Sequence, residues 1–211
     1  MPNNVELCLT KIFFIRDYAS GTADVRQSRF LISTSASESS SNSAPYRWWV
    51  PITFAPAGGN FNDTYPKAWL REDQERSKVS GLPDSETAVV FNVQETGYYR
   101  VNYDKKNWQM IAKQLEKDHL SIHVVNRAQI IDDAINLAKS GHLDYQTALS
   151  VTGYLSKEVE YVPWVSALNG LSYINTMMKR TAAYGEFKKS VFYPQIMRGN
   201  YPTFPGTCYA W

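Results

Sequence analysis

Gly97-Tyr98-Tyr99-Arg100-Val101-Asn102-Tyr103-Asp104, with Trp108 shortly after it, is where the sequence changes from the period of strands to the period of helices. Within this stretch Tyr99, Val101 and Tyr103 alternate with polar residues, which is typical of a half-buried strand. From Trp108 onward the apolar residues follow helical spacing, as in Trp108, Ile111, Ala112 and Leu115. The sequence therefore predicts a β part and an α part that meet near Tyr103-Asp104.

Several short strands are predicted upstream of this point. The strongest runs from Tyr46 to Phe54, where the side chains alternate, and Pro51 favours an edge or a bulge because proline cannot donate to a ladder. The other candidates are Asp24 to Ser33, Lys67 to Arg71, Ala88 to Val93 and Tyr98 to Tyr103. A serine-rich run at 35–43 is predicted to be a loop. Short strands separated by turn residues indicate a small β-sandwich.

Four helices are predicted downstream. After the helix at Trp108, a second apolar stripe runs from Val124 to Ala138, and Gly141 is well placed to end it. Asp144 is a suitable N-cap for a third helix, and Pro163 suits the first turn of a fourth. The apolar positions of these last two helices are Ala148, Val151 and Leu155, then Trp164, Leu168, Leu171, Asn175 and Met178. The predicted fold class is α+β in two modules, a β-sandwich followed by an α-helical hairpin array (a truncated α-solenoid).

Composition excludes some functions and leaves others open. The 211 residues carry 22 basic and 20 acidic side chains without a basic stripe, which argues against nucleic acid as a partner. No apolar run approaches the roughly 20 residues of a membrane span, and the run at 11–15 is too short for a signal sequence. Two cysteines, Cys8 and Cys208, leave pairing and redox compartment open. Asn62-Asp63-Thr64 is an acceptor sequence for N-glycosylation at Asn62.

No catalytic or metal-ligating residue is predicted in the chain. His119 and His123 have the i, i+4 spacing of a zinc helix, but Leu120 occupies the place of the general-base glutamate. The pair also falls between two helices, so a loop or helix-end role is favoured, and His142 is expected in a solvated turn. Adjacent carboxylates, Glu72-Asp73 and Asp132-Asp133, are expected to point in different directions.

Structural roles are favoured for the remaining polar and aromatic motifs. Arg127, Asp132 and Asp133 are predicted to hold a polar network that fixes helix register. Tyr161, Pro163 and Trp164 are predicted to form a stiff helix entry.

The stretch from Gly97 to Asp104 closely resembles the strand that ends the β-sandwich domain of aminopeptidase N-like zinc metallopeptidases, the gluzincin aminopeptidases. Further segments resemble the family in the same order and spacing, over about residues 17 to 190. They are Ser28-Arg29-Phe30-Leu31, Tyr46-Arg47-Trp48-Trp49-Val50-Pro51-Ile52, Asn126-Arg127-Ala128-Gln129-Ile130-Ile131-Asp132-Asp133-Ala134, Leu143-Asp144-Tyr145 and Glu160-Tyr161-Val162-Pro163-Trp164.

The resemblance implies a division of the chain into four segments. Residues 17–104 would form the β-sandwich domain and 105–190 the start of the C-terminal helical domain, between an atypical N-terminal segment at 1–16 and an atypical tail at 191–211. A truncated or mispredicted gene product would explain both ends, because the family's catalytic domain should precede the sandwich and more helices should follow.

The resemblance also implies a function for the full-length form. Such enzymes are membrane-associated, face the extracellular side of the plasma membrane and remove N-terminal residues from peptides, with zinc bound by H-E-x-x-H and a downstream glutamate. This chain lacks that domain, so no cofactor is expected in it and it should be inactive alone. Its partner would be the missing catalytic domain, and its helices would cap the active-site cavity. Two alternatives remain open: a docking module without catalysis, and an unstable truncated gene product.

Overall fold

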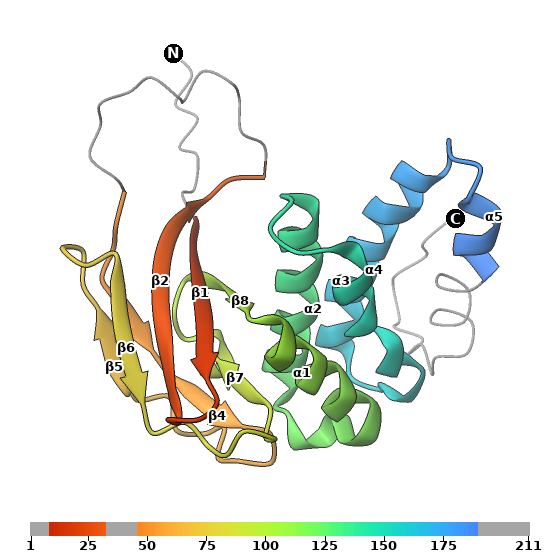
Figure 1. Cartoon of the computed structure of the whole chain (residues 1–211). Helices are drawn as coiled ribbons and strands as arrows, with labels where there is room; N and C mark the ends of the chain where they lie inside the picture. Colours follow the sequence, from red (N-terminus) through yellow and green to blue (C-terminus); the bar gives the residue numbers. More distant parts are fainter. Residues whose placement is uncertain (1–8, 33–45, 190–211) are drawn as a thin grey trace.

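The computed structural model describes residues 9–32 and 46–189, and within them the protein is a mixed α+β fold. The strands lie on one side of the molecule and the helices on the other (Figure 1). The expected fold class is thereby confirmed at this level. Cys8, Cys208, the serine-rich run at 35–43 and the tail at 191–211 lie outside the described residues.

The largest sheet has four strands in the order β6 (Arg76–Ser80), β2 (Thr22–Phe30), β1 (Leu9–Asp17) and β8 (Tyr99–Tyr103). β1 pairs antiparallel with β2 and parallel with β8, so it is a central strand of this sheet. The sequence did not predict β1, which lies largely within the segment 1–16, although Ile12 and Phe14 alternate toward the core. It also missed β6, since Val79 is its one buried residue and polar edge strands carry little apolar signal.

Two smaller sheets complete the β part. β3 (Val50–Ile52) pairs with β5 (Ala68–Leu70), and β4 (Phe54–Pro56) pairs with β7 (Val89–Phe91). The predicted strand from Tyr46 to Phe54 is therefore shorter and divided at Thr53, whose side-chain hydroxyl accepts a hydrogen bond from the Val93 amide at 2.8 Å. Pro51 lies in a two-stranded sheet, as the edge prediction required.

The helices begin directly after β8. Asp104 caps α1 (Lys105–Asp118) by accepting from the Asn107 amide. α2 (Val124–Lys139) ends before Gly141, whose φ of 75° confirms the predicted helix stop. Asp144 caps α3 (Tyr145–Ser150), again as predicted.

The third helix is shorter than its apolar positions suggested, because a 3-10 turn at Gly153–Lys157 takes up Leu155. α4 (Tyr161–Met178) packs mainly against α2, and α5 (Tyr184–Phe187) follows it. None of these helices, within the residues described, has the length and apolarity that crossing a membrane would require.

Strands and helices share one continuous hydrophobic core. Trp108 of α1 is fully buried, packs edge-to-face on Tyr103 of β8 at 4.9 Å and donates from Nε1 to Asn102 at 2.9 Å. On the other face of Tyr103 the core continues into the sheets through Phe91 and Phe14, which stack at 3.7 Å. The residues that mark the change of period in the sequence therefore form the centre of the packed molecule.

Candidate functional site

The junction between β8 and α2 carries a charged cluster. Arg100 Nη1 lies 2.5 Å from Asp132 Oδ2 and 2.9 Å from Asp133 Oδ1. Asp133 Oδ2 also accepts from the Val101 amide at 2.9 Å, so one carboxylate binds both a side chain and the backbone of the strand. The expectation that Asp132 and Asp133 point apart is corrected here. Neighbouring side chains on a helix point in different directions, but the Arg100 guanidinium lies between Asp132 and Asp133 and contacts both carboxylates.

The two carboxylates differ in environment. The Asp132 side chain is 42 % exposed and the Asp133 side chain only 6 %. Burial raises the pKa of Asp133 to about 7, although Arg100 and the Val101 amide both pull it down. Burial lowers the pKa of Arg100, but the charges of Asp133 and Asp132 outweigh this and raise it overall. Arg100 and Asp133 are therefore a tightly coupled pair inside the junction.

A second ion pair connects α2 to the start of α4. Arg127 Nε lies 2.7 Å from Glu158 Oε2, and Nη2 donates to Oε1 at 3.1 Å. Arg127 Nη1 donates to the carbonyl of Ile122 at 2.7 Å. Burial raises the pKa of Glu158, and hydrogen bonds from Arg127 and the Glu160 amide lower it by more, so the net shift is downward. Trp164 donates from Nε1 to the carbonyl of Glu158, so this pair anchors the predicted stiff helix entry.

The polar network predicted from Arg127, Asp132 and Asp133 is thus two separate networks. Arg127 pairs with Glu158, and the two aspartates pair with Arg100. Neither Glu158 nor Arg100 was identified as a partner from sequence. Both residues lie in or beside the segments that resemble the family. Each is more than 30 residues from its partner in the sequence, so the pairing could not be predicted from spacing.

A strained turn precedes β8. Asn92, Gln94 and Glu95 have φ values of 60°, 53° and 52°, in the left-handed region that costs non-glycine residues about 1–2 kcal/mol each. Asn126 of α2 holds this turn, because its Oδ1 accepts from the Gln94 amide at 2.8 Å and its Nδ2 donates to the Asn92 carbonyl at 3.0 Å. No role was predicted for Asn126 from the sequence, although an asparagine among the apolar positions of a helix is the signal that marks it.

The histidines have local roles. His119 lies in the 3-10 turn between α1 and α2, with its ring 5.5 Å from that of Tyr154. His123 caps α2, since its Nδ1 accepts from the Val125 amide at 3.3 Å. His142 is exposed. Among residues 9–32 and 46–189, no group of three or more His, Cys, Asp and Glu side chains is arranged to hold a metal ion.

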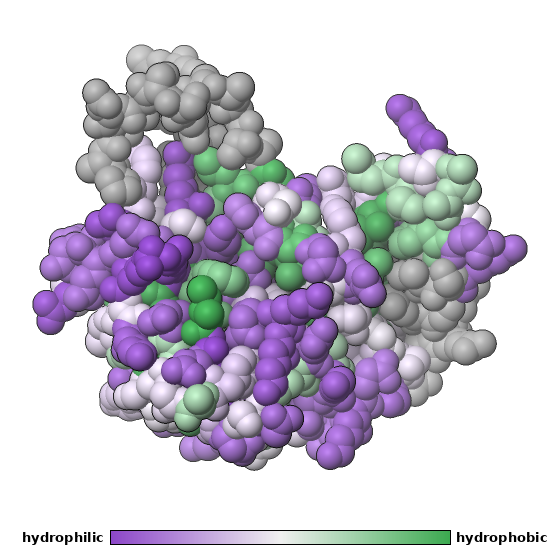
Figure 2. All heavy atoms as spheres, in the orientation of Figure 1, coloured by the Kyte–Doolittle hydropathy of each residue, from purple (hydrophilic) through white to green (hydrophobic). Residues whose placement is uncertain are grey.

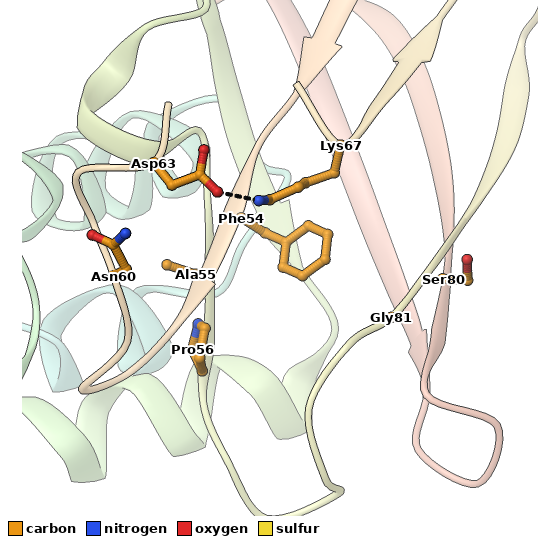
Figure 3. Close-up of a pocket in the computed structure, with 8 residues that line it drawn as sticks. All are labelled: Phe54, Ala55, Pro56, Asn60, Asp63, Lys67, Ser80 and Gly81. Atoms are coloured by element: carbon orange, nitrogen blue, oxygen red, sulfur yellow. Dashed lines mark hydrogen bonds and ion pairs between the residues drawn. The ribbon is translucent and has the colours of Figure 1, made fainter. Parts of the chain in front are cut away.

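A shallow pocket of about 420 Å³ opens beside β4, with Phe54 in its wall and the ion pair of Lys67 with Asp63 across it (Figure 3). These two charges pair with each other, and Ser80 lies apart from them on the other side of the pocket (Figure 3). The face of the molecule seen in Figure 2 is largely hydrophilic, apart from small apolar areas and a larger one over α4 and α5 at the upper right.

The segment that contains β8 and α2 matches a known protein family. Residues 88–198 match the family model of the ERAP1-like C-terminal domain. Aminopeptidase N of Plutella xylostella is 38 % identical over 171 residues, which cover 80 % of this chain and 17 % of that protein. Human aminopeptidase N is 38 % identical over 169 residues, 80 % of this chain and 17 % of the relative.

The rat thyrotropin-releasing hormone-degrading ectoenzyme is 32 % identical over 146 residues, 69 % of this chain and 14 % of that protein. The chain thus spans less than a fifth of the length of these relatives.

Proposed function

Because the chain belongs to the ERAP1-like C-terminal domain family, we propose that it is the non-catalytic support of a zinc aminopeptidase, whose helical part caps the active-site cavity and limits which peptides enter. In this proposal the β part is the sandwich domain, predicted at 17–104 and here extended to include β1 (Leu9–Asp17), and the helices at 105–190 are the first members of a longer array. The zinc and the residues that cleave peptides belong to a catalytic domain elsewhere in the longer protein.

The observation that supports this proposal best is the set of buried and hydrogen-bonded contacts between the sheets and the helices. A cap can select peptides by size only if it keeps a fixed position relative to the part that carries it. The Arg100 cluster and the buried Trp108 join β8 to α2 and α1, and Asn126 joins α2 to the turn before β8. Buried, hydrogen-bonded contacts of this kind fix geometry more than they add stability.

The surface of α4 supports the longer helical array. Tyr161, Val162 and Met177 are about half exposed on a helix that also buries Trp164 and Leu171 on its inner side. A helix that is apolar on several sides is usually covered by neighbours. We therefore propose that further helices of the array pack on α4 in the longer protein, as neighbouring repeats do in solenoids.

We also propose that the longer protein acts at the extracellular side of the plasma membrane, as the family resemblance suggests. A second candidate function, docking of a partner without catalysis, is favoured by one surface. Trp49, just before β3, and Trp69 of β5 are 54 % and 49 % exposed, and the guanidinium of Arg71 lies 5.6 Å from the Trp49 ring centroid. Tryptophan and arginine are enriched among residues that dominate interfaces.

The test compares the enzyme that carries this chain with its Arg100→Met variant, which removes the charged contacts between β8 and α2 and leaves the shared hydrophobic core in place. Hydrolysis of a short alanyl chromogenic substrate and of a long peptide is measured for both enzymes. We expect the substitution to raise the rate on the long peptide relative to the short one, because the cap is held less firmly, and the isolated 211-residue chain to hydrolyse neither. Zinc-dependent turnover by the isolated chain, or an unchanged ratio between the substrates, would contradict the proposal.

A further inference from the structure

The turn between β4 and β5 contains the acceptor sequence Asn62-Asp63-Thr64, which is the only such tripeptide in the whole sequence. The Asn62 side chain is exposed and outside every strand and helix. The Asn62 amide donates to Asn60 Oδ1 at 3.0 Å, and the Tyr65 amide donates to Asp63 Oδ1 at 3.3 Å. Such side-chain-to-backbone bonds stabilise an open turn, in which Asn62 is exposed.

A small hollow lies between this turn and the turn that joins α1 to α2. Its volume is about 290 Å³, and its walls include Asn62 and Phe61 on one side and Leu120, Ser121 and His123 on the other. The Gly58 amide donates to the Ser121 carbonyl at 2.8 Å, so the two turns are held together by a backbone bond. Leu120 is 70 % exposed at the rim. A hollow at the lower limit of about 300–1,000 Å³ for ligand sites holds few free ligands.

We propose that Asn62 carries an N-linked glycan whose first sugar lies over Leu120 in this hollow, and so bridges the sheet part to the helical part. The small volume of the hollow does not prevent this contact, because a sugar attached covalently to Asn62 is held at high effective concentration beside Leu120. The hollow also has the mixed character that a sugar ring needs, with an apolar wall at Leu120 and polar groups at Ser121 and His123.

The modification requires a sugar donor, here an oligosaccharide carried on a lipid diphosphate. The Nδ2 atom of Asn62 forms a bond to the anomeric carbon of the first sugar and loses one proton. The bond from that carbon to the phosphate oxygen breaks, and the lipid diphosphate leaves. This inference rests on the proposed extracellular location, since the donor and its transferase act on proteins that enter the secretory route.

Occupancy is tested on the full chain, secreted from eukaryotic cells behind an added signal sequence, so that the natural location of the protein does not affect the result. Treatment with an amidase that removes N-glycans should shift the wild-type chain to lower mass. Asn62→Gln and Thr64→Ala should abolish the shift, whereas Thr64→Ser and Asn60→Gln should keep it. A secreted wild-type chain without a glycan would overturn the proposal and leave the proposed function untouched.

The bridge is tested by thermal unfolding. Trimming the glycan to its first sugar should leave Tm unchanged. Thr64→Ala, which carries no glycan, should have a Tm lower by roughly 2–4 °C than that of Thr64→Ser, which keeps the glycan. Leu120→Ser should lower Tm only when the sugar is present. Equal Tm values for Thr64→Ala and Thr64→Ser would overturn the bridge, and failure of the peptide-size test above would not affect this outcome.

Discussion

Arg127 and Glu158 face each other as a buried ion pair, 31 residues apart in the sequence, with side chains 4 % and 0 % exposed. Each also binds backbone: Arg127 donates to the Ile122 carbonyl, and Glu158 accepts from the amides of Val159 and Glu160. The pair therefore connects three chain segments, the entry to α2, α2 itself and the entry to α4. Its geometry satisfies the conditions under which a buried pair is tolerated.

Removing one member of this pair should destabilise the fold strongly. Arg127→Met leaves the Glu158 carboxylate buried without its cation, and the expected loss is about 3–5 kcal/mol in the free energy of unfolding. The double variant Arg127→Met/Glu158→Leu should recover much of that loss, because no uncompensated charge remains. Chemical denaturation measures both. A single variant that loses less than about 1 kcal/mol would show that the pair is solvated in solution.

The Arg100 cluster should make stability depend on pH near neutrality. The pKa of Asp133 is raised by burial to about 7 in the folded protein, above its usual value. The folded state then binds more protons than the unfolded state between about pH 4 and pH 7, so this group's contribution to stability falls as pH rises through that range. Several exposed aspartates have lowered pKa values and act in the opposite direction, among them Asp17, Asp63 and Asp84.

The measurement is therefore a difference between variants. Asp133→Asn should remove the falling contribution, so that its unfolding free energy rises more steeply, or falls less, from pH 4 to pH 7 than that of the wild type. Asp132→Asn, at the exposed rim of the same cluster, is the comparison variant and should weaken the falling contribution without removing it, because burial is the main cause of the raised Asp133 pKa and the Asp132 charge a smaller one. Parallel curves for the wild type and Asp133→Asn would mean that Asp133 is ionised throughout this range.

Local chemistry was predictable from sequence in this protein, and long-range pairing was not. Asp104, Asp144 and Gly141 limit helices as predicted, because caps and stops depend on a few neighbouring residues. β6 escaped notice because an exposed edge strand needs little apolar content.

The junction shows the same limit. Asp132 and Asp133 were recognised as structural, but their partner Arg100 is more than 30 residues away, and helical geometry alone suggested that they diverge. The role of Asn126 was also not predictable, because it depends on the left-handed backbone at Gln94, and the residue type at position 94 does not indicate that conformation. The periodicity of apolar residues predicted only that strands are followed by helices, whereas the family was predicted from the resemblance of several segments.

The strained turn should reverse the usual ranking of alanine and glycine. Glu95 has a φ of 52°, which glycine adopts freely and alanine does not. Glu95→Gly should therefore be more stable than Glu95→Ala by about 0.5–1 kcal/mol, after the greater entropy of unfolded glycine is subtracted. Asn126→Ala should cost about 2 kcal/mol or more, because the Gln94 amide loses its partner. Urea denaturation of the three variants checks the order, and an advantage for Glu95→Ala would refute the strain.

Gly170 should not tolerate alanine although it lies inside a helix. Alanine normally stabilises a helix by about 1 kcal/mol relative to glycine. At Gly170 a Cβ atom would collide with the Ile135 side chain, where α4 approaches α2 closely. Gly170→Ala should instead destabilise the protein by about 1–3 kcal/mol, as overpacking does.

Adding Ile135→Ala should make the alanine at position 170 neutral or favourable, because the obstructing methyl groups are gone. Gly185→Ala, in α5 with no atom near the added Cβ, is the control expected to be harmless. If Gly170→Ala alone raised Tm, the close approach of α4 to α2 would be wrong, and with it the packing that the proposed helical cap requires.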